Sequence, residues 1–146
     1  RERDFQKDYE VNVLGLVNIL KNYQLALNQN SSVVTISSIA ADFGMPFHAS
    51  IAMCKASVEA LTRSLAAEWA PKVRLNCIAP SLVETKMTER LTNSDSKKEA
   101  IENKHPLKKI GETSDIANMI SFLLSDKSKW ITGQTIRIDG GLSTIR

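Results

Sequence analysis

The chain has 146 residues, of which 42% are hydrophobic and 24% are charged, and its formal net charge is +3. This length is enough for one domain with a core of its own, and the composition is ordinary for a soluble globular protein. The sequence contains no run of about 18 apolar residues that could form a transmembrane helix, and no signal peptide is evident. We therefore expect no membrane partner.

The first half of the chain alternates between helical and strand patterns. Residues 4–28 carry apolar side chains at helical spacing and predict one long helix, which the polar run 28–31 ends. The short, β-branched run 33–36 predicts a buried strand of a parallel sheet. After a loop, an apolar stripe predicts a second helix over residues 49–70, with Pro71 beyond its end.

The second half continues this alternation around a polar middle. Residues 84–107 are mostly polar and charged, so the helical signal within them is weak. The elements expected here are a strand at 73–78 stopped by Pro80, weak helices at 85–91 and 96–103, a helix at 115–124 capped by Thr113 or Ser114, and a strand at 134–138 closed by Asp139, Gly140 and Gly141.

This order of elements predicts an α/β fold. Alternating helices and strands imply right-handed crossovers and a parallel sheet that helices cover on both faces. We therefore expect three parallel strands with flanking helices. The strand at 33–36 would lie at one edge of the sheet with an open apolar side, which proteins normally cover or pair.

The pattern of basic residues, cysteines and histidines argues against nucleic-acid binding and against a metal site. Lysines gather between positions 97 and 109, but glutamates interrupt them and aromatic residues do not interleave with them. This pattern indicates a solvated face, so no nucleic-acid partner is expected. Cys54 and Cys77 lie in apolar segments and predict small buried thiols in a reducing compartment, which we take to be the cytoplasm. His48 and His105 are not at ligand spacing to them, so no metal site is expected.

Three positions share one place in the predicted fold. Ser38 follows the first strand, and Ile51 and Lys55 lie four residues apart in the second helix. Side chains at i and i+4 share one helical face, so position 51 and the Lys55 ammonium would point at the same place. A hydroxyl at the strand end could face both. In this chain the side chain at position 51 is the hydrocarbon of Ile51, which can neither donate nor accept a proton.

Five stretches occur in a familiar order: VNVLGLVN, VVTISSIAA, CKASVEALTRSLAAEWAP, VRLNCIAPSLVETKM and ITGQTIRIDGG. Together they cover almost the whole chain and resemble the C-terminal part of the short-chain dehydrogenase/reductases. The resemblance implies the C-terminal half of a doubly wound, Rossmann-type parallel sheet. It also implies an NAD(P)-dependent oxidoreductase that acts on a carbonyl or an alcohol in its full-length form.

The resemblance implies roles for four positions. In the family, a Tyr is the general acid/base, a Ser orients the substrate carbonyl, a Lys lowers the Tyr pKa and binds the nicotinamide ribose, and an Asn holds a water of the proton relay. By motif, Asn12, Ser38 and Lys55 take the Asn, Ser and Lys positions, and Ile51 takes the Tyr position. A cation beside a phenol favours its ionised form, so without the phenol Lys55 has nothing to activate.

No other phenol stands at the strand end. Tyr9 and Tyr23 lie on the first predicted helix, away from it. His48, three residues before Ile51, is the alternative acid that the pattern leaves open.

The segment from Pro80 to Thr85 resembles the family segment that holds the nicotinamide carboxamide. The resemblance assigns cofactor contacts to Pro80, to the backbone at Val83 and to the Thr85 hydroxyl. The family usually has Gly after the Pro, where this chain has Ser81. If that turn requires a positive φ, Ser81 costs about 1 kcal/mol.

The Gly-rich phosphate loop of the family, G-x-x-x-G-x-G, does not occur in the sequence. The resemblance therefore places residues 1–146 as the C-terminal part of the family domain, without the N-terminal dinucleotide-binding part, and Arg1 fits a processed, truncated or engineered start. The cofactor of the full-length family fold is NAD or NADP. We expect this chain alone to bind neither, because the pyrophosphate has no helix N-terminus to sit on.

Two functional hypotheses follow. The first is a short-chain dehydrogenase/reductase whose activity in this chain is lost or impaired because of Ile51. The alternative is a non-catalytic structural or binding partner that keeps the assembly surfaces of the family. In the family, the helices that correspond to residues 4–28 and 49–70 pack against their copies, so a homo-oligomer is expected. A small-molecule substrate is expected if the chain is active.

Overall fold

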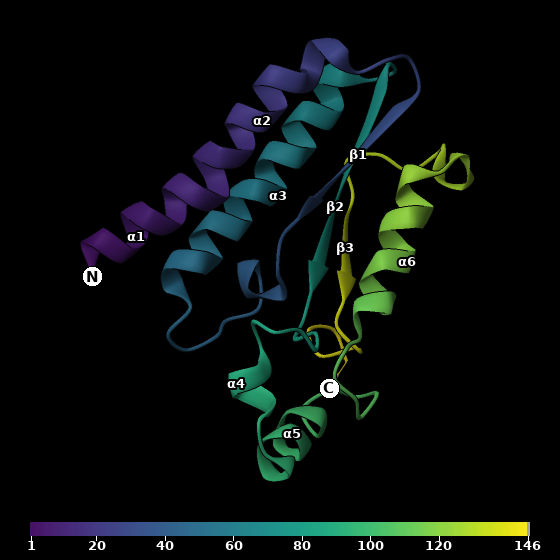
Figure 1. Cartoon of the computed structure of the whole chain (residues 1–146). Helices are drawn as coiled ribbons and strands as arrows, with labels where there is room; N and C mark the ends of the chain where they lie inside the picture. The colour runs from purple at the N-terminus through teal and green to yellow at the C-terminus, as the bar shows by residue number, and fades with distance from the viewer. Residues whose placement is uncertain (146) are drawn as a thin grey trace.

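The computed structural model describes residues 1–145 and contains a three-stranded parallel sheet between two helical layers (Figure 1). The strands β1 (Ser31–Ile36), β2 (Val73–Pro80) and β3 (Thr135–Ile138) lie in the order β1-β2-β3. The N-terminal helices and α3 (Ala49–Trp69) cover one face, and α6 (Thr113–Leu124) covers the other. The structure confirms the expected α/β class, with three parallel strands and flanking helices.

The N-terminal helical segment is interrupted, where one helix over residues 4–28 was expected. The chain runs through α1 (Glu2–Tyr9), a π-helical turn η1 (Glu10–Leu14), α2 (Gly15–Tyr23) and a 3₁₀ turn η2 (Gln24–Ala26). At the π turn, the side-chain amide of Asn12 donates to the Asp8 carbonyl at 3.0 Å, four residues back, where an α-helical backbone bond would end. The spacing of apolar residues did not reveal this turn, because a single π turn adds only one residue to an otherwise helical pattern.

Helix α3 packs along the sheet through small side chains spaced four residues apart. Cys54, Val58, Thr62 and Ala66 are buried, and Thr62 Oγ1 lies 2.7 Å from Thr35 Oγ1 of β1. The helix ends at Trp69, one residue earlier than expected, because the residue before a proline disfavours the α conformation.

Strand β2 continues to Pro80, although Pro80 was expected to stop it. Pro80 pairs with Ile138 at the end of the ladder, and the next residue, Ser81, donates its N–H to the Ile138 carbonyl at 3.1 Å. The missing proline N–H therefore falls at the last position of the strand, where it costs no ladder bond.

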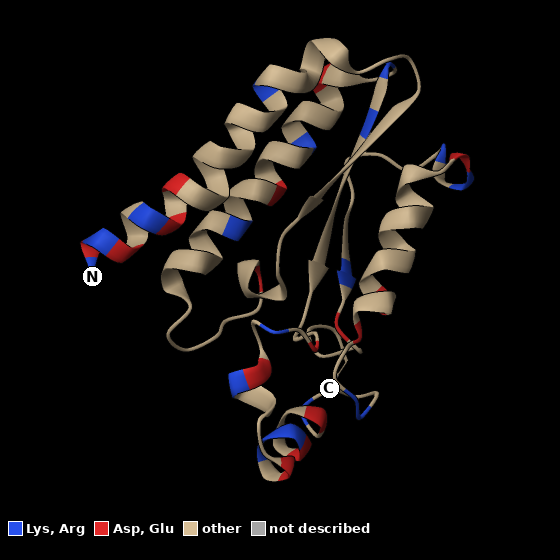
Figure 2. Ribbon diagram, viewed as in Figure 1, with Lys and Arg blue, Asp and Glu red and all other residues tan. Residues whose placement is uncertain are grey.

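The polar middle forms two short helices, α4 (Glu89–Thr92) and α5 (Asp95–Glu102). α4 starts later than the expected helix at 85–91, because the Thr88 hydroxyl donates to the Val83 carbonyl at 2.6 Å and holds the preceding residues in a turn. Both helices carry basic and acidic residues (Figure 2), and Lys98 pairs with Glu84 at 2.6 Å.

Helix α6 begins two residues before the expected start at 115. Its N-cap is Glu112, and the expectation of Thr113 or Ser114 at the cap is wrong. Glu112 and Asp115 form a reciprocal capping box, in which the Asp115 carboxylate accepts the Glu112 N–H at 2.9 Å. Two carboxylates near the first turn also suit the positive end of the helix dipole.

The core lies where α3 and α6 meet β2. Leu75, Ile78 and Leu123 are fully buried, and Cys54 and Cys77 lie beside them as free, buried thiols, as expected. Burial is the main cause that raises the pKa of both thiols, so they are protonated at neutral pH. Within residues 1–145, no helix combines the length and apolar character needed to span a bilayer.

Candidate functional site

The candidate site is built at the carboxyl ends of β1 and β2, which lie side by side. Ile36 pairs with Ile78 in the sheet, and the Ser37 N–H donates to the Ile78 carbonyl at 2.8 Å. Ser38 follows β1 at this edge and Pro80 ends β2 there. This edge of an open parallel sheet is where α/β proteins place their ligands.

Ser38 turns the chain away from β1 into the 3₁₀ turn η3 (Ile39–Ala41). Its backbone is extended, and its Oγ accepts the Ala40 N–H at 3.2 Å as the cap of that turn. The preceding residue, Ser37, is tied to α3: its hydroxyl lies 2.7 Å from Glu59 Oε1 and 3.2 Å from the Lys55 carbonyl. These bonds fix the strand end against the helix that carries the other site residues.

Lys55 reaches the same strand end from α3. Its ammonium donates to the Ile36 carbonyl at 3.1 Å, so the charge lies next to the segment that carries Ser38. Burial is the first cause that lowers the pKa of Lys55 below its ordinary value. The structure therefore brings a hydroxyl and a partly desolvated cation to one place.

Ile51 lies on α3, one turn before Lys55, and its side chain is half-buried. Next to it, the Ser50 hydroxyl donates to Asp8 Oδ2 at 2.5 Å and ties the start of α3 to α1. His48 is the N-cap residue of α3, and its Nδ1 donates to the Pro46 carbonyl at 2.7 Å. A hydrocarbon thus occupies the position one helical turn before the lysine.

Asn12 sits in the π turn η1, which packs against α3. Its amide nitrogen donates one hydrogen bond to the Asp8 carbonyl, which leaves the amide oxygen and the second N–H for other partners. π turns within helices are frequent at functional sites. Tyr9 and Tyr23 lie on α1 and α2 with exposed side chains.

The segment after Pro80 is held by backbone bonds to a later loop. Val83 pairs with Gly111 in an isolated parallel bridge, and the Glu84 N–H donates to the Gly111 carbonyl at 2.9 Å. The Thr85 hydroxyl is exposed and lies 3.2 Å from Thr88 Oγ1. Pro80, Val83 and Thr85 therefore follow the same sheet edge as Ser38.

Ser81 adopts no strained backbone. Within residues 1–145, the non-glycine residues with a positive φ are Asn30, Phe47 and Lys108. The cost considered for Ser81 does not arise, because the turn after Pro80 does not require the left-handed region.

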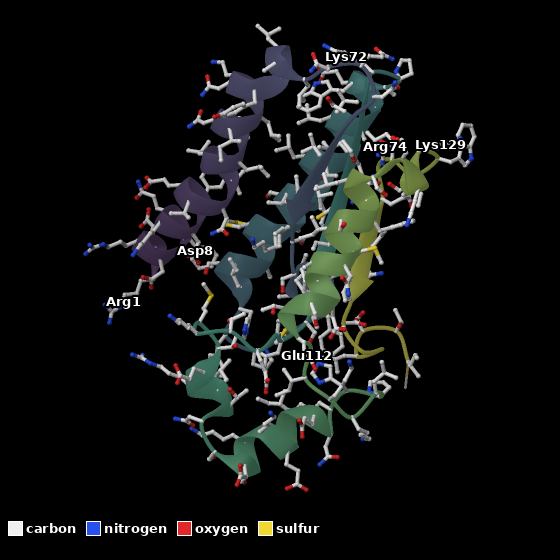
Figure 3. The ribbon with its side chains drawn as sticks, turned by 45° about the vertical axis from the view of Figure 1, so that its right-hand side comes forward. Arg1, Asp8, Lys72, Arg74, Glu112 and Lys129 are labelled. Atoms are coloured by element: carbon white, nitrogen blue, oxygen red, sulfur yellow. The ribbon has the colours of Figure 1, made fainter. Side chains whose placement is uncertain are left out.

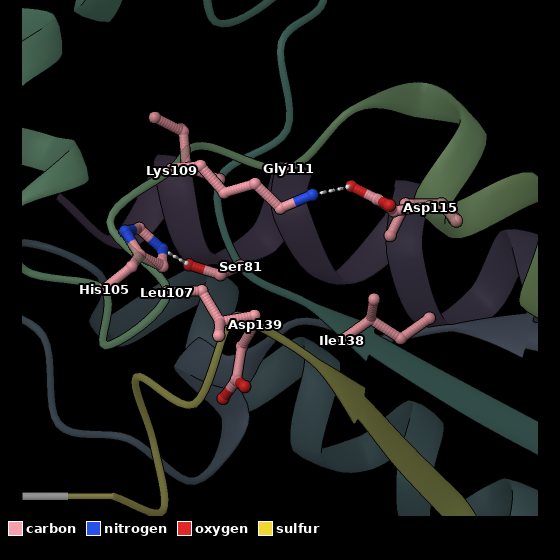
Figure 4. Close-up of a pocket in the computed structure, with 11 residues that line it drawn as sticks. Ser81, His105, Leu107, Lys109, Gly111, Asp115, Ile138 and Asp139 are labelled. Carbon is pink, nitrogen blue, oxygen red and sulfur yellow. Dashed lines mark hydrogen bonds and ion pairs between the residues drawn. The ribbon is translucent and has the colours of Figure 1, made fainter.

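The sequence did not reveal a pocket of about 210 Å³ beside this segment (Figure 4). Ser81 and the buried His105 meet in its wall, and Asp139 lies at its edge. Burial alone would raise the pKa of the Asp139 carboxyl, but hydrogen bonds from Ser143 and Gly141 outweigh this and hold the pKa below its ordinary value. The ITGQTIRIDGG stretch indicated that Asp139 follows the last strand. Nothing in the sequence linked Ser81 to His105.

Comparisons with known proteins give one consistent result. Residues 1–143 match the family described as enoyl-(acyl carrier protein) reductase. The chain is 39% identical, over 144 residues, to the tropinone reductase-like 3 protein of Erythroxylum coca, covering 97% of this chain and 55% of that protein.

Solved structures agree with this match. A short-chain dehydrogenase/reductase (glucose/ribitol dehydrogenase) of Brucella melitensis superposes with a TM-score of 0.92 at 34% identity, over 97% of this chain and 57% of that one. A gluconate 5-dehydrogenase of Burkholderia cenocepacia, in complex with NADP and tartrate, superposes with a TM-score of 0.89 at 25% identity, over 99% and 58% of the two chains. The chain thus spans a little over half the length of these relatives.

Proposed function

Because the chain belongs to the short-chain dehydrogenase/reductase family, we propose that it is the carbonyl-side part of an NAD(P)-dependent oxidoreductase and that its own activity is lost or impaired. One observation carries this proposal. The Lys55 ammonium is held at the end of β1, 3.1 Å from the Ile36 carbonyl and next to Ser38, while Ile51 stands one turn away.

The chemistry of these side chains explains the expected impairment. In the proposed arrangement, Ser38 orients a substrate carbonyl, and the amide oxygen of Asn12 takes a place in the proton relay. Lys55 would lower the pKa of a phenol at position 51, but Ile51 has no proton to give. General acid–base catalysis contributes about 10²–10⁴-fold to a rate, so its loss is expected to reduce turnover at least that much.

Three residues of the candidate site suit the nicotinamide and ribose half of a dinucleotide. The Lys55 ammonium, the backbone at Val83 and the exposed Thr85 hydroxyl form a donor and acceptor set that suits a ribose and a carboxamide. The sequence has no Gly-rich phosphate loop to receive the pyrophosphate. We therefore propose NAD or NADP as the cofactor of the complete family fold, and no useful cofactor binding by residues 1–146 alone.

A second candidate function is that of a non-catalytic partner. The observation that favours it is the apolar surface of the N-terminal helices, where Val11, Ile19 and Tyr23 are more than half exposed. Such a surface suits packing against a second copy, with α3 as its neighbour. Loss of the phenol would leave this assembly role intact.

Activity measurements separate the two functions. Oxidation of NADH and NADPH is followed with a panel of small aldehydes and ketones, for the chain and for Ile51→Tyr, each alone and mixed with the N-terminal part of a relative. We expect turnover only for Ile51→Tyr with the N-terminal part. Ile51→Phe, which adds the ring without the hydroxyl, is the matched control and should stay inactive.

Cofactor titration tests the binding half of the proposal. NADH and NADPH are added to the chain alone, and binding is followed by calorimetry or fluorescence. Saturable binding tighter than about 100 μM, which corresponds to roughly 5 to 6 kcal/mol, would contradict it. Turnover by the unmodified chain would show that an acid other than a residue at position 51 acts.

A further inference from the structure

Ser81 and His105 form a hydrogen-bonded pair in the wall of the 210 Å³ pocket (Figure 4). Ser81 Oγ lies 2.9 Å from His105 Nε2, although the residues are 24 positions apart. Ser81 follows β2, whereas His105 lies in the turn after α5. Among the described residues, neither member of the pair is hydrogen-bonded to Ser38 or Lys55.

The partners of His105 assign its protons. Nδ1 lies 2.9 Å from the Ile101 carbonyl, which can only accept, so Nδ1 carries the hydrogen. In the neutral imidazole, Nε2 then has a free lone pair, and the Ser81 hydroxyl donates to it. A hydroxyl that donates to an imidazole, whose other nitrogen is fixed by an acceptor, is the arrangement of an activated nucleophile and its base.

The imidazole ring is held in this position. His105 is 3% exposed, and a Cβ on Gly140 would meet its Cβ and Cδ2, each at 3.6 Å. These are ordinary van der Waals contacts, so it is the φ of +58°, and not the space beside the ring, that favours glycine at position 140. The base therefore does not need to be ordered when a ligand enters.

The rest of the wall suggests a neutral ligand with a small apolar part. Leu107, Ile116 and Ile138 supply apolar surface. The carboxylates of Asp115 and Asp139 disfavour an anionic ligand. Lys109, whose ammonium lies 3.6 Å from Asp115, brings a positive charge to the same wall.

We propose that Ser81 and His105 are a nucleophile and general base, and that this pocket hydrolyses small, neutral acyl esters. Ser81 Oγ forms a bond to the acyl carbon while its proton passes to His105 Nε2, and the C–O bond to the alcohol breaks as that proton passes to the departing oxygen. A water oxygen then forms a bond to the acyl carbon as one water proton passes to Nε2, and the bond from the acyl carbon to Ser81 Oγ breaks as that proton passes to Oγ, which releases the carboxylic acid. Lys109 offsets the charge that develops on the carbonyl oxygen.

Two measurements test this proposal on the 146-residue chain. An alkyl fluorophosphonate should label Ser81, which mass spectrometry of the digested protein locates. p-Nitrophenyl acetate should be hydrolysed, and Ser81→Gly and His105→Gln should each lower the rate by about a hundredfold, the size of a general-base contribution. A label elsewhere, no label, or an unchanged rate in Ser81→Gly would overturn it.

Control variants exclude non-specific effects of removing a hydroxyl and misfolding as causes of these results. Ser96→Ala alters an exposed hydroxyl on α5 and should keep both the label at Ser81 and the rate. Glycine is the family's usual residue at position 81, so Ser81→Gly should fold, which circular dichroism and thermal melts check. If His105→Gln does not fold, the label site in the unmodified chain and the rate of Ser81→Gly decide the matter.

Discussion

Lys55 joins α3 to the end of β1, because its ammonium donates to the Ile36 carbonyl at 3.1 Å. This bond crosses 19 residues of sequence and holds the cation next to the segment that carries Ser38. Burial at this position disfavours the charged form of Lys55 and lowers its pKa from 10.5.

The lowered pKa of Lys55 predicts a pH dependence of stability. Between the folded-state pKa and 10.5, the unfolded chain binds more protons than the folded chain, so the free energy of unfolding contributed by Lys55 rises with pH in this window. Urea melts from pH 8 to 10.5 should show the unmodified chain gaining stability relative to Lys55→Met. Exposed Lys86, changed to Met, is the control and should leave the slope unaltered. A fall relative to Lys55→Met would contradict the sign.

Asp139 should stabilise the turn after β3. Its carboxylate accepts the Gly141 N–H at 2.9 Å and the Ser143 N–H at 3.0 Å. We expect Asp139→Asn to lower the free energy of unfolding by about 1.5–3 kcal/mol at pH 7, the range for hydrogen bonds to a charged group. Chemical denaturation measures the difference.

The lowered pKa of Asp139 also predicts how the stability difference between the unmodified chain and Asp139→Asn depends on pH. The pKa of Asp139 lies below 3.8 in the folded chain, so its contribution is present above 3.8 and is lost as the pH falls through the folded-state pKa. The gap between the unmodified chain and Asp139→Asn should therefore shrink only in acid. A gap that is already closed at pH 5 would show that the carboxylate is not the stabilising form.

Arg74 caps the end of α6 from the neighbouring strand (Figure 3). Its guanidinium donates to the Leu123 carbonyl at 3.0 Å, the Ser125 carbonyl at 3.1 Å and the Ser128 hydroxyl at 2.9 Å. The Leu123 carbonyl also accepts from the Ser32 hydroxyl at 2.7 Å, so replacing Arg74 removes the charged donor, but not every donor, at the negative end of the helix dipole.

We expect Arg74→Met to cost about 2–3 kcal/mol in the free energy of unfolding. Arg74→Lys should lose part of this, because an ammonium keeps the charge but not the planar fork. Arg90→Met on exposed α4 is the matched control. Equal melts for Arg74→Met and Arg90→Met would contradict the capping role.

The sequence predicted those features that depend on local order. Strand β1 follows from its β-branched run, and the Lys55 position relative to Ile51 follows from helical spacing alone. The bond between Ser81 and His105 could not be predicted, because tertiary folding brings together residues 24 positions apart. The Glu112 cap was missed for a different reason, since Thr113 and Ser114 have the stronger capping preference, whereas the local capping box of Glu112 and Asp115 marks the helix start.

Self-association is the last expected property. α1 and α2 expose several large apolar side chains, and Ile36 at the open edge of β1 is 49% exposed. Burying these against a second copy removes apolar surface from water and covers unpaired strand groups, so the 16.2 kDa chain should not be a stable monomer. Light scattering at tens of micromolar should give a mass above 16.2 kDa, and the thermal midpoint should rise with protein concentration.

A charge on that surface should oppose association. Ile19→Glu places a carboxylate among the exposed apolar residues of α2 and should shift the mass toward the monomer, while Leu107→Glu, near the Ser81 pocket and outside these helices, should not. Because a charge at an interface must be desolvated or paired, one substitution is enough to weaken the contact. A monomer with a melt independent of concentration would instead mean that this half of the family fold closes its own core.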